Sequence, residues 1–123
     1  MTIIKIFIVE DDFSLQRLYE LMLTNYGFEV IGKANNGEEA LKMYKEFNDK
    51  PEIILMDHRM PIKNGIETTR EIIKLNYDTI IIFASADKTV KDEALSIGAS
   101  RFLSKPFSYE ELIDEIKDCL NLK

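Results

Sequence analysis

The side chains best suited to chemistry in this 123-residue chain follow four separate apolar runs. The acidic run Glu10–Asp12 follows the first of them and Asp57 follows another, while Ser85 and Lys105 stand at the ends of two more. Carboxylate oxygens are the ligands that Mg²⁺ prefers, and an aspartate can accept a phosphoryl group as a nucleophile. A lysine ammonium neutralises phosphate charge. Brought together, these side chains would suit phosphoryl transfer, which mainly needs positioning and charge neutralisation.

Each of these residues also has an ordinary structural explanation. The acidic run could form a solvated loop, Asp57 could be a turn residue, Ser85 a helix cap and Lys105 a surface lysine. Their shared place after successive apolar runs is what favours a common site. Carboxylates about 5 Å apart repel by roughly 3 kcal/mol per pair at an effective dielectric of about 20. A cluster of them therefore predicts a bound divalent cation.

Strand-like and helix-like patterns alternate along the whole chain. Apolar runs predict five strands, at Ile3–Val9, Phe28–Ala34, Glu52–Met56, Thr79–Ala84 and Arg101–Ser104. Helical patterns between and after them predict five helices, from Ser14 to Gly27, from a cap at Asn36 to Phe47, over Ile66–Leu75, from a cap at Asp87 to about Ile97, and from a capping box at Ser108 and Glu111 onward.

This alternation predicts an α/β fold with a parallel sheet covered by helices on both faces. The first, third and fourth runs are almost wholly apolar, which is typical of central strands buried on both sides. The other two are more polar and belong at the edges. The order 2-1-3-4-5 satisfies this, so we expect a doubly wound, flavodoxin-like, five-stranded sheet with five helices. Ligands bind such sheets at the carboxyl ends of the strands.

The composition narrows the class of protein. We expect residues 1–123 to form a single domain, since the length and the 46% hydrophobic content are ordinary for one. The net charge of −6 argues against nucleic-acid binding by this domain and against adhesion to anionic membranes. No run reaches the roughly 18 apolar residues of a membrane span. The lone Cys119, expected to be a packed thiol, fits a reducing cytoplasm.

Four segments, IFIVEDD, ILMDHRMPIKNG, IIIFASAD and FLSKPF, together resemble the response-regulator receiver family of two-component signalling. The likeness is strongest to its stand-alone, chemotaxis-regulator-like members and covers essentially the whole chain. Its most specific element is D-x-x-M-P-x-x-x-G, which runs here from Asp57 to Gly65.

The resemblance implies a role for each residue at the strand ends. Asp57 would be the phosphoryl acceptor, and an acidic pair would bind Mg²⁺ together with Asp57 and the backbone carbonyl of Arg59. Lys105 would contact the phosphoryl oxygens, and Ser85 would be the hydroxyl that turns toward the phosphoryl group.

Further residues would form the rim and the switch. By the resemblance, Ala86 leaves room for the phosphate and Pro106 follows a peptide bond that is typically cis. Phe102 stands where many members carry an aromatic that changes rotamer on activation, although it could also be an edge-strand core aromatic. Asp12 and Asp87 would lie at the rim of the site.

The acidic pair can be chosen in two ways, because three acids stand in a row. A gap-free match from Gly27 makes the pair Glu10 and Asp11, whereas a match from Arg17 makes it Asp11 and Asp12. We prefer Glu10 and Asp11, because that match also keeps the apolar face of the first helix in register.

The implied function is a phosphorylation-activated switch. A histidine kinase or phosphotransfer protein would supply the phosphoryl group, and a downstream protein would read the face made by the fourth helix, fifth strand and fifth helix. The domain would catalyse its own Mg²⁺-dependent phosphorylation and dephosphorylation without being an enzyme for other substrates. A lone receiver is preferred to one excised from a longer regulator.

Two other classes of function were compared with this one. A haloacid-dehalogenase-like phosphatase would want an acid two residues after the nucleophile, where this chain has Arg59. A receiver used only for binding would be expected to lack Asp57 or Lys105, and both are present.

The lifetime of the phosphoryl group depends on two rim positions in this family, here Arg59 and Asp87. Their opposite charges could pair across the mouth of the site and obstruct water. The alternative is that both are solvated.

Overall fold

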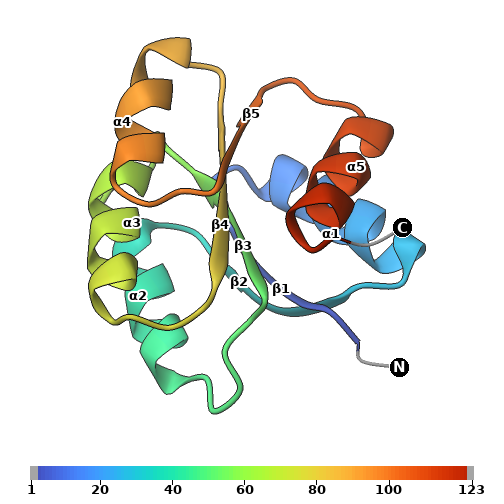
Figure 1. Cartoon of the computed structure of the whole chain (residues 1–123), viewed down its shortest axis with the longest axis horizontal. Coiled ribbons are helices and arrows are strands. Elements are labelled where there is room, and N and C mark those ends of the chain that lie inside the picture. The colour runs from blue at the N-terminus through green and yellow to red at the C-terminus, as the bar shows by residue number, and fades with distance from the viewer. Residues whose placement is uncertain (1–2, 122–123) are drawn as a thin grey trace.

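A computed structural model describes residues 3–121 of the chain. Five parallel strands form one sheet in the order β2-β1-β3-β4-β5, which confirms the predicted topology (Figure 1). The strands are β1 (Lys5–Val9), β2 (Glu29–Ala34), β3 (Ile53–Asp57), β4 (Ile80–Ser85) and β5 (Arg101–Ser104).

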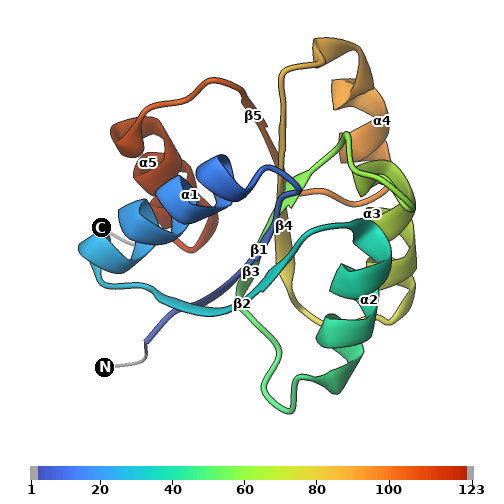
Figure 2. The same ribbon diagram turned by 180° about the vertical axis from the view of Figure 1, so that it is seen from behind.

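Five α-helices cover the two faces of the sheet. They are α1 (Phe13–Tyr26), α2 (Gly37–Glu46), α3 (Gly65–Lys74), α4 (Lys91–Ser96) and α5 (Tyr109–Cys119). Helices α1 and α5 lie on one face, and α2, α3 and α4 lie on the other (Figures 1 and 2). No helix within residues 3–121 is both long enough and apolar enough to cross a membrane.

Burial follows the predicted difference between central and edge strands. Every residue of β3 is buried, and only the first residue of β1 and of β4 is not. Edge strand β2 has one buried residue, Ala34, and edge strand β5 also has one, Leu103. Alternate side chains of the central strands feed two cores, one beneath α1 and α5 and one beneath α2, α3 and α4.

The start and the buried face of α1 differ from the sequence prediction. The helix begins at Phe13 rather than Ser14, because the Asp12 side chain caps it by accepting from the backbone N–H groups of Ser14 and Leu15. Leu18 and Tyr26 belong to the apolar pattern that predicts this helix, but they are 44% and 43% exposed and do not lie on its buried face.

Three other residues of α1 are buried instead. They are Gln16, Tyr19 and Leu23. The polar residue Gln16 thus takes a buried position that hydropathy would assign to an apolar residue.

The fourth predicted helix is divided into two pieces. Asp87 caps a single 3-10 turn, Lys88–Val90, and α4 then runs only over Lys91–Ser96. No side chain caps α4, and Ala94 is its one buried residue. This segment is therefore the least firmly anchored helix of the sheet's second face.

The packing around Gly65 explains why the D-x-x-M-P-x-x-x-G element ends in glycine. Its N–H donates to the His58 carbonyl at 2.8 Å, which folds the loop back over the end of β3. A Cβ at this position would collide with the Asp57 carbonyl oxygen and lie 2.8 Å from the Cα of His58. Only glycine permits this close approach, so the residue that ends the element also places Asp57.

We expect Gly65→Ala to lower the free energy of unfolding by roughly 2 kcal/mol, because the added methyl group overpacks the backbone of Asp57. Lys74→Ala, at the exposed end of the same helix, is the control and should change it by no more than about 0.5 kcal/mol. Urea denaturation with a chelator present measures both. Equal effects of the two substitutions would contradict this account of Gly65.

Candidate functional site

The carboxyl ends of β1, β3, β4 and β5 meet at one edge of the sheet and enclose an open cavity of about 290 Å³. Nine of the predicted site residues line it together with Leu15, which was not predicted, while the predicted Phe102 and Pro106 are not among its lining residues. The lining residues are Glu10, Asp11, Asp12, Leu15, Asp57, Arg59, Ser85, Ala86, Asp87 and Lys105. The strand order, rather than proximity in sequence, brings them together.

Three carboxylates form the centre of this site. Glu10, Asp11 and Asp57 each offer an oxygen within 4.8 Å of the others. Glu10 and Asp57 are 2% and 7% exposed, so their charges are largely removed from water. Hard oxygen donors at this spacing fit a divalent cation such as Mg²⁺.

Asp12 lines the cavity, but its side chain caps α1. Its side-chain oxygen is occupied by the N–H groups of Ser14 and Leu15 at 2.9 and 3.1 Å. Its own N–H donates to the Glu10 carboxylate at 3.2 Å. This arrangement favours Glu10 and Asp11 as the acidic pair, and Asp12 as the residue that orients one of them.

Lys105 lies between two of the carboxylates. Its ammonium donates to Glu10 at 2.6 Å and to Asp57 at 2.9 Å, and it lies 5.9 Å from the centre of the Tyr19 ring. Burial opposes the charge of Lys105, but the hydrogen bonds to Glu10 and Asp57 outweigh that effect and raise its pKa. The ammonium is thus held charged at the point where phosphoryl oxygens would carry negative charge.

The electrostatics of the acidic pair are set by burial. Burial raises the pKa of Glu10 to about 7, and the charge of Asp57 adds to the effect while the hydrogen bond from Lys105 opposes it. Burial, together with neighbouring Asp57, also raises the pKa of Asp11. Carboxyl groups with raised pKa values are those that gain most from a nearby cation.

Ser85 and Ala86 occupy the end of β4. Ser85 is 3% exposed, and its hydroxyl oxygen accepts from the N–H of Asp87 at 3.0 Å. Ala86 is exposed and presents only a methyl group to the cavity. The hydroxyl is therefore held by its own loop and not by the carboxylates.

An ion pair joins Arg59 to Asp87 at 2.9 Å, and both residues line the cavity. Asp87 is fixed in addition by Thr89, whose N–H and hydroxyl donate to its other oxygen at 3.0 and 2.5 Å. The bonds from Thr89, followed by that from Arg59, lower the pKa of Asp87. The proposed partners across the mouth do make contact, and Asp87 is the rigid member of the pair.

Two remaining predictions concern the last strand and the loop after it. Phe102 is half-buried and stacks on Phe83, with ring centroids 6.2 Å apart and planes 20° apart. The Lys105–Pro106 peptide bond is cis, and Pro106 is exposed. Rotamer exchange of Phe102 and metal ligation by the Arg59 carbonyl stay predictions.

Sequence reasoning missed two polar residues close to the site. Gln16 is buried and donates to the carbonyl of Glu10. His58, next to Asp57, packs its ring 5.7 Å from that of Phe83, and its buried Nδ1 has no hydrogen-bond partner among the described residues. A glutamine in an otherwise apolar helix face was the available indication for the first; nothing in the sequence marked the second.

Comparison with known proteins identifies the family. The family model described as the response regulator receiver domain matches residues 6–117. The chemotaxis protein CheY of Thermotoga maritima is 36% identical over 114 residues, which cover 91% of this chain and 93% of that protein. CheY of Bacillus subtilis is 33% identical over 119 residues, covering 95% and 98%.

Solved structures show the same relationship. A chain in the crystal structure of a CheX–CheY–BeF3–Mg²⁺ complex from Borrelia burgdorferi is similar with a TM-score of 0.90 and 25% identity, covering 95% of this chain and 89% of that one. The response regulator domain of Thermotoga maritima CheB gives a TM-score of 0.87 at 28% identity, with 99% of each chain covered.

The metal-free protein should lose stability as pH rises from about 4.5 to about 7. Across this window the folded state holds a proton on Glu10 that the unfolded state has released, so unfolding becomes easier by about 1–3 kcal/mol. Urea denaturation in chelator at several pH values measures this.

Two comparisons isolate the cause. Glu10→Gln should remove most of the slope between those pH values, because it removes the titrating group. Mg²⁺ should raise the melting temperature of the wild type more at pH 8 than at pH 5.5, since it binds the ionised form. A slope unchanged in Glu10→Gln would contradict the assignment.

Proposed function

We propose that this chain, which belongs to the response regulator receiver family, is a two-component signalling switch that accepts a phosphoryl group on Asp57 with the help of Mg²⁺. The donor would be a histidine kinase or a phosphotransfer protein. The observation that carries the proposal is the Lys105 ammonium, which bridges Glu10 and Asp57 beside Asp11. Such a group of charges has no structural need at a sheet edge that could have been apolar or solvated.

The chemistry follows from the positions of the side chains. A carboxylate oxygen of Asp57 would form a bond to phosphorus, while the phosphorus–nitrogen bond of a phosphohistidine breaks and its electron pair stays on the imidazole. The Lys105 ammonium, a compact positive charge on a flexible stem, would contact the phosphoryl oxygens. Mg²⁺, held by Glu10, Asp11, Asp57 and the Arg59 carbonyl, would supply further positive charge to those oxygens.

The response would travel toward β5. The Ser85 hydroxyl, which accepts from the N–H of Asp87, would turn to the phosphoryl group. That change would pull on the loop before α4, the helix that lacks a side-chain cap and buries one residue. Phe102, on the neighbouring strand, would then repack against Phe83.

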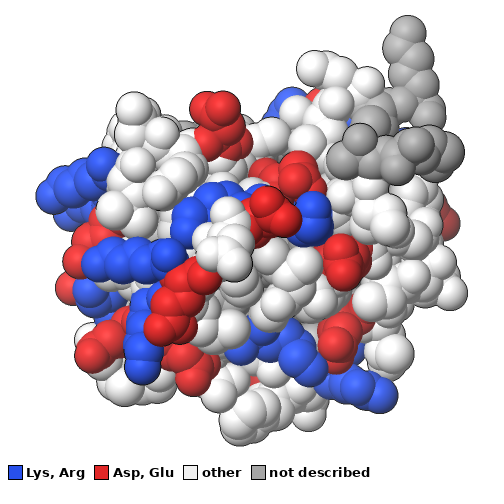
Figure 3. Space-filling view, turned by 90° about the horizontal axis from the view of Figure 1, so that it is seen from below, with Lys and Arg blue, Asp and Glu red and all other residues white. Residues whose placement is uncertain are grey.

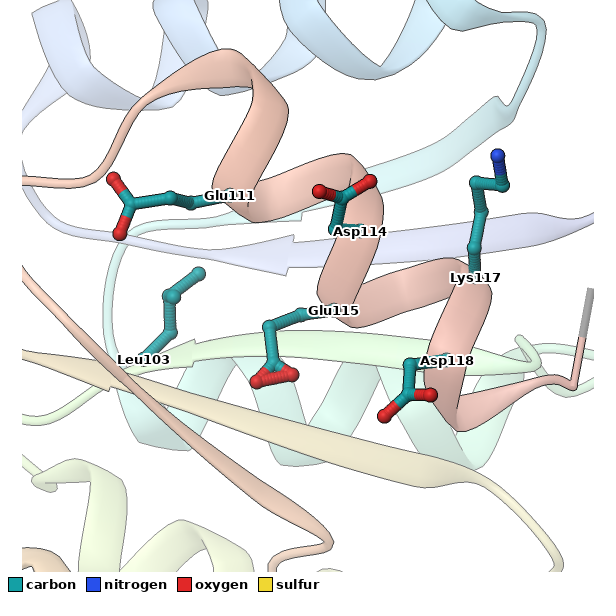
Figure 4. Close-up of a pocket in the computed structure, with 6 residues that line it drawn as sticks. All are labelled: Leu103, Glu111, Asp114, Glu115, Lys117 and Asp118. Atoms are coloured by element: carbon teal, nitrogen blue, oxygen red, sulfur yellow. The ribbon is translucent and has the colours of Figure 1, made fainter.

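The proposed output face comprises α4, β5 and α5. It contains an open depression of about 550 Å³, lined by Leu103 of β5 and by side chains of α5 (Figure 4). One lysine and four acids line its α5 wall: Glu111, Asp114, Glu115, Lys117 and Asp118. Asp118 is paired with Arg101 of β5 at 2.9 Å, so this wall is tied to the strand that the switch would move.

Partners are proposed on the same basis. The Borrelia structure contains CheY together with CheX, BeF3 and Mg²⁺, which supports a protein target and a phosphoryl-like, metal-bound state for this chain too. Binding of nucleic acid by the domain stays disfavoured. On the face seen in Figure 3, basic side chains lie among acidic ones and form no single basic surface. We retain the cytoplasm as the expected location.

A small phosphodonor with Mg²⁺ should label Asp57 as an acid-stable, base-labile acyl phosphate. Intact-mass and peptide mass spectrometry measure the label. Asp57→Asn should abolish it, while Asp49→Asn, an acid outside the site, should leave it unchanged. Undiminished labelling of Asp57→Asn would refute the assignment of the acceptor.

The Arg59–Asp87 pair should lengthen the life of the phosphoryl group, because it stands at the mouth through which water must enter. Arg59→Ala or Asp87→Ala should speed autodephosphorylation by about tenfold or less. The double variant should lose its phosphoryl group no faster than the faster of the two single variants. Independent, additive effects in this cycle would show that the two residues do not act as a gate.

Activation should change hydrogen exchange from Asp87 through Phe102 and at α5. Comparing exchange with and without beryllofluoride and Mg²⁺ measures this, and Asp57→Asn is the control that should show no change. Changes confined to α2 and α3 would rule out the proposed output face.

A further inference from the structure

Gln16 is the one amide side chain buried against the acidic site in the described structure. The residue is 7% exposed and lies near the start of α1. Its side-chain Nε2 donates toward the carbonyl of Glu10 at 3.0 Å, the carbonyl of Ala34 at 3.3 Å and the side-chain oxygen of Asn35 at 3.0 Å. Two N–H groups thus serve three acceptors from two strand ends.

Both polar groups of the Glu10 backbone are hydrogen-bonded, and Gln16 donates to one of them and to the acceptor of the other. The N–H of Glu10 donates to the Ala34 carbonyl at 3.0 Å, and that same carbonyl accepts from Gln16. The Glu10 carbonyl accepts from Gln16 directly. Glu10 lies one residue beyond β1, whose register with its neighbours ends at Val9. The glutamine therefore adds a second link between Glu10 and the end of β2, beside this last hydrogen bond to the sheet.

The support matters because the Glu10 side chain is long and its carboxylate has two separate partners. One oxygen accepts from Lys105 at 2.6 Å and the other from the N–H of Asp12 at 3.2 Å. A small rotation of the Glu10 peptide would be amplified at the carboxylate, which must also stay within 4.8 Å of oxygens of Asp11 and Asp57.

Leucine or methionine would fill the same volume in a face that also buries Tyr19 and Leu23. Neither could satisfy the two carbonyls, and burying a glutamine costs free energy unless it is hydrogen-bonded. The side chain's value therefore lies in its N–H groups.

We propose that Gln16 is a positioning residue for the metal site, and that it acts by clamping the Glu10 main chain to the end of β2. The inference rests on the proposed function, since it assigns Glu10 to the cation. It adds Gln16 of α1 to the residues that determine the affinity of the site for Mg²⁺. Groups that orient a ligand typically contribute tenfold or more to metal affinity.

Calorimetric titration with Mg²⁺ alone, at pH 8 and a temperature where all variants are folded, tests this. Gln16→Leu and Gln16→Met should weaken Mg²⁺ binding about tenfold. In chelator, the Glu10 amide should exchange its hydrogen faster in both. The matched control is Tyr44→Phe, which loses the bond from Tyr44 to Thr79 at 2.7 Å, remote from the cavity-lining residues. It should lose stability but keep both the Mg²⁺ affinity and the protection of Glu10.

The outcomes separate this inference from the proposed function. Wild type that binds no Mg²⁺ would refute the metal site, while exchange at Glu10 would still test the clamp. Gln16 variants that bind Mg²⁺ within twofold of wild type, or an equal loss in Tyr44→Phe, would overturn the positioning role. If the Gln16 variants do not fold, Asn35→Ala decides, because it removes a competing acceptor. Affinity should then be unchanged or higher, and a loss would overturn the proposal.

Discussion

The interaction on which the rest of the structure depends is the contact of one ammonium with two buried carboxylates. Lys105 reaches Glu10 and Asp57 from a different strand end, and Asp11 completes an acidic group that would otherwise repel itself. Such an arrangement requires a scaffold that holds charged groups close together against their mutual repulsion. The apolar central strands supply it, because β1, β3 and β4 are buried through to their last residues, which lie next to the site.

The connections after these strands show how the same constraint shapes the loops. Asp12 caps α1 and donates its N–H to Glu10, so the helix start and the acidic site share one residue. Gly65 lets the loop after β3 fold onto the Asp57 carbonyl. The segment after β4 is less constrained, since a single 3-10 turn and an uncapped six-residue helix follow Ser85. Rigid acidic elements thus stand beside one weakly anchored element.

The fold could be predicted from the sequence because its determinants are local patterns with different periods. Apolar runs marked the central strands, and their polarity ranked the edges, so that the strand order followed. The juxtaposition of Glu10, Asp57, Ser85 and Lys105 then came from topology alone. The predicted helix ends and buried helix faces were less accurate where one side chain could serve two structural roles. Asp12 was assigned to the rim although it also caps a helix, and the apolar period of α1 passed over Gln16, whose burial depends on carbonyls that only the folded sheet presents.

The charges of the metal-free site do not balance. With all groups ionised, the three carboxylates and Lys105 leave a formal charge of −2 at this edge of the sheet. Lys105 can neutralise only part of it, and burial, to which the charge of Asp57 adds, raises the pKa of Glu10. A divalent cation would restore neutrality without displacing the ammonium from the sheet edge. The ammonium would then be free to exchange a carboxylate oxygen for a phosphoryl oxygen. The imbalance that lowers the stability of the metal-free fold is thus the physical reason for the proposal that this site takes up a cation and then a phosphoryl group.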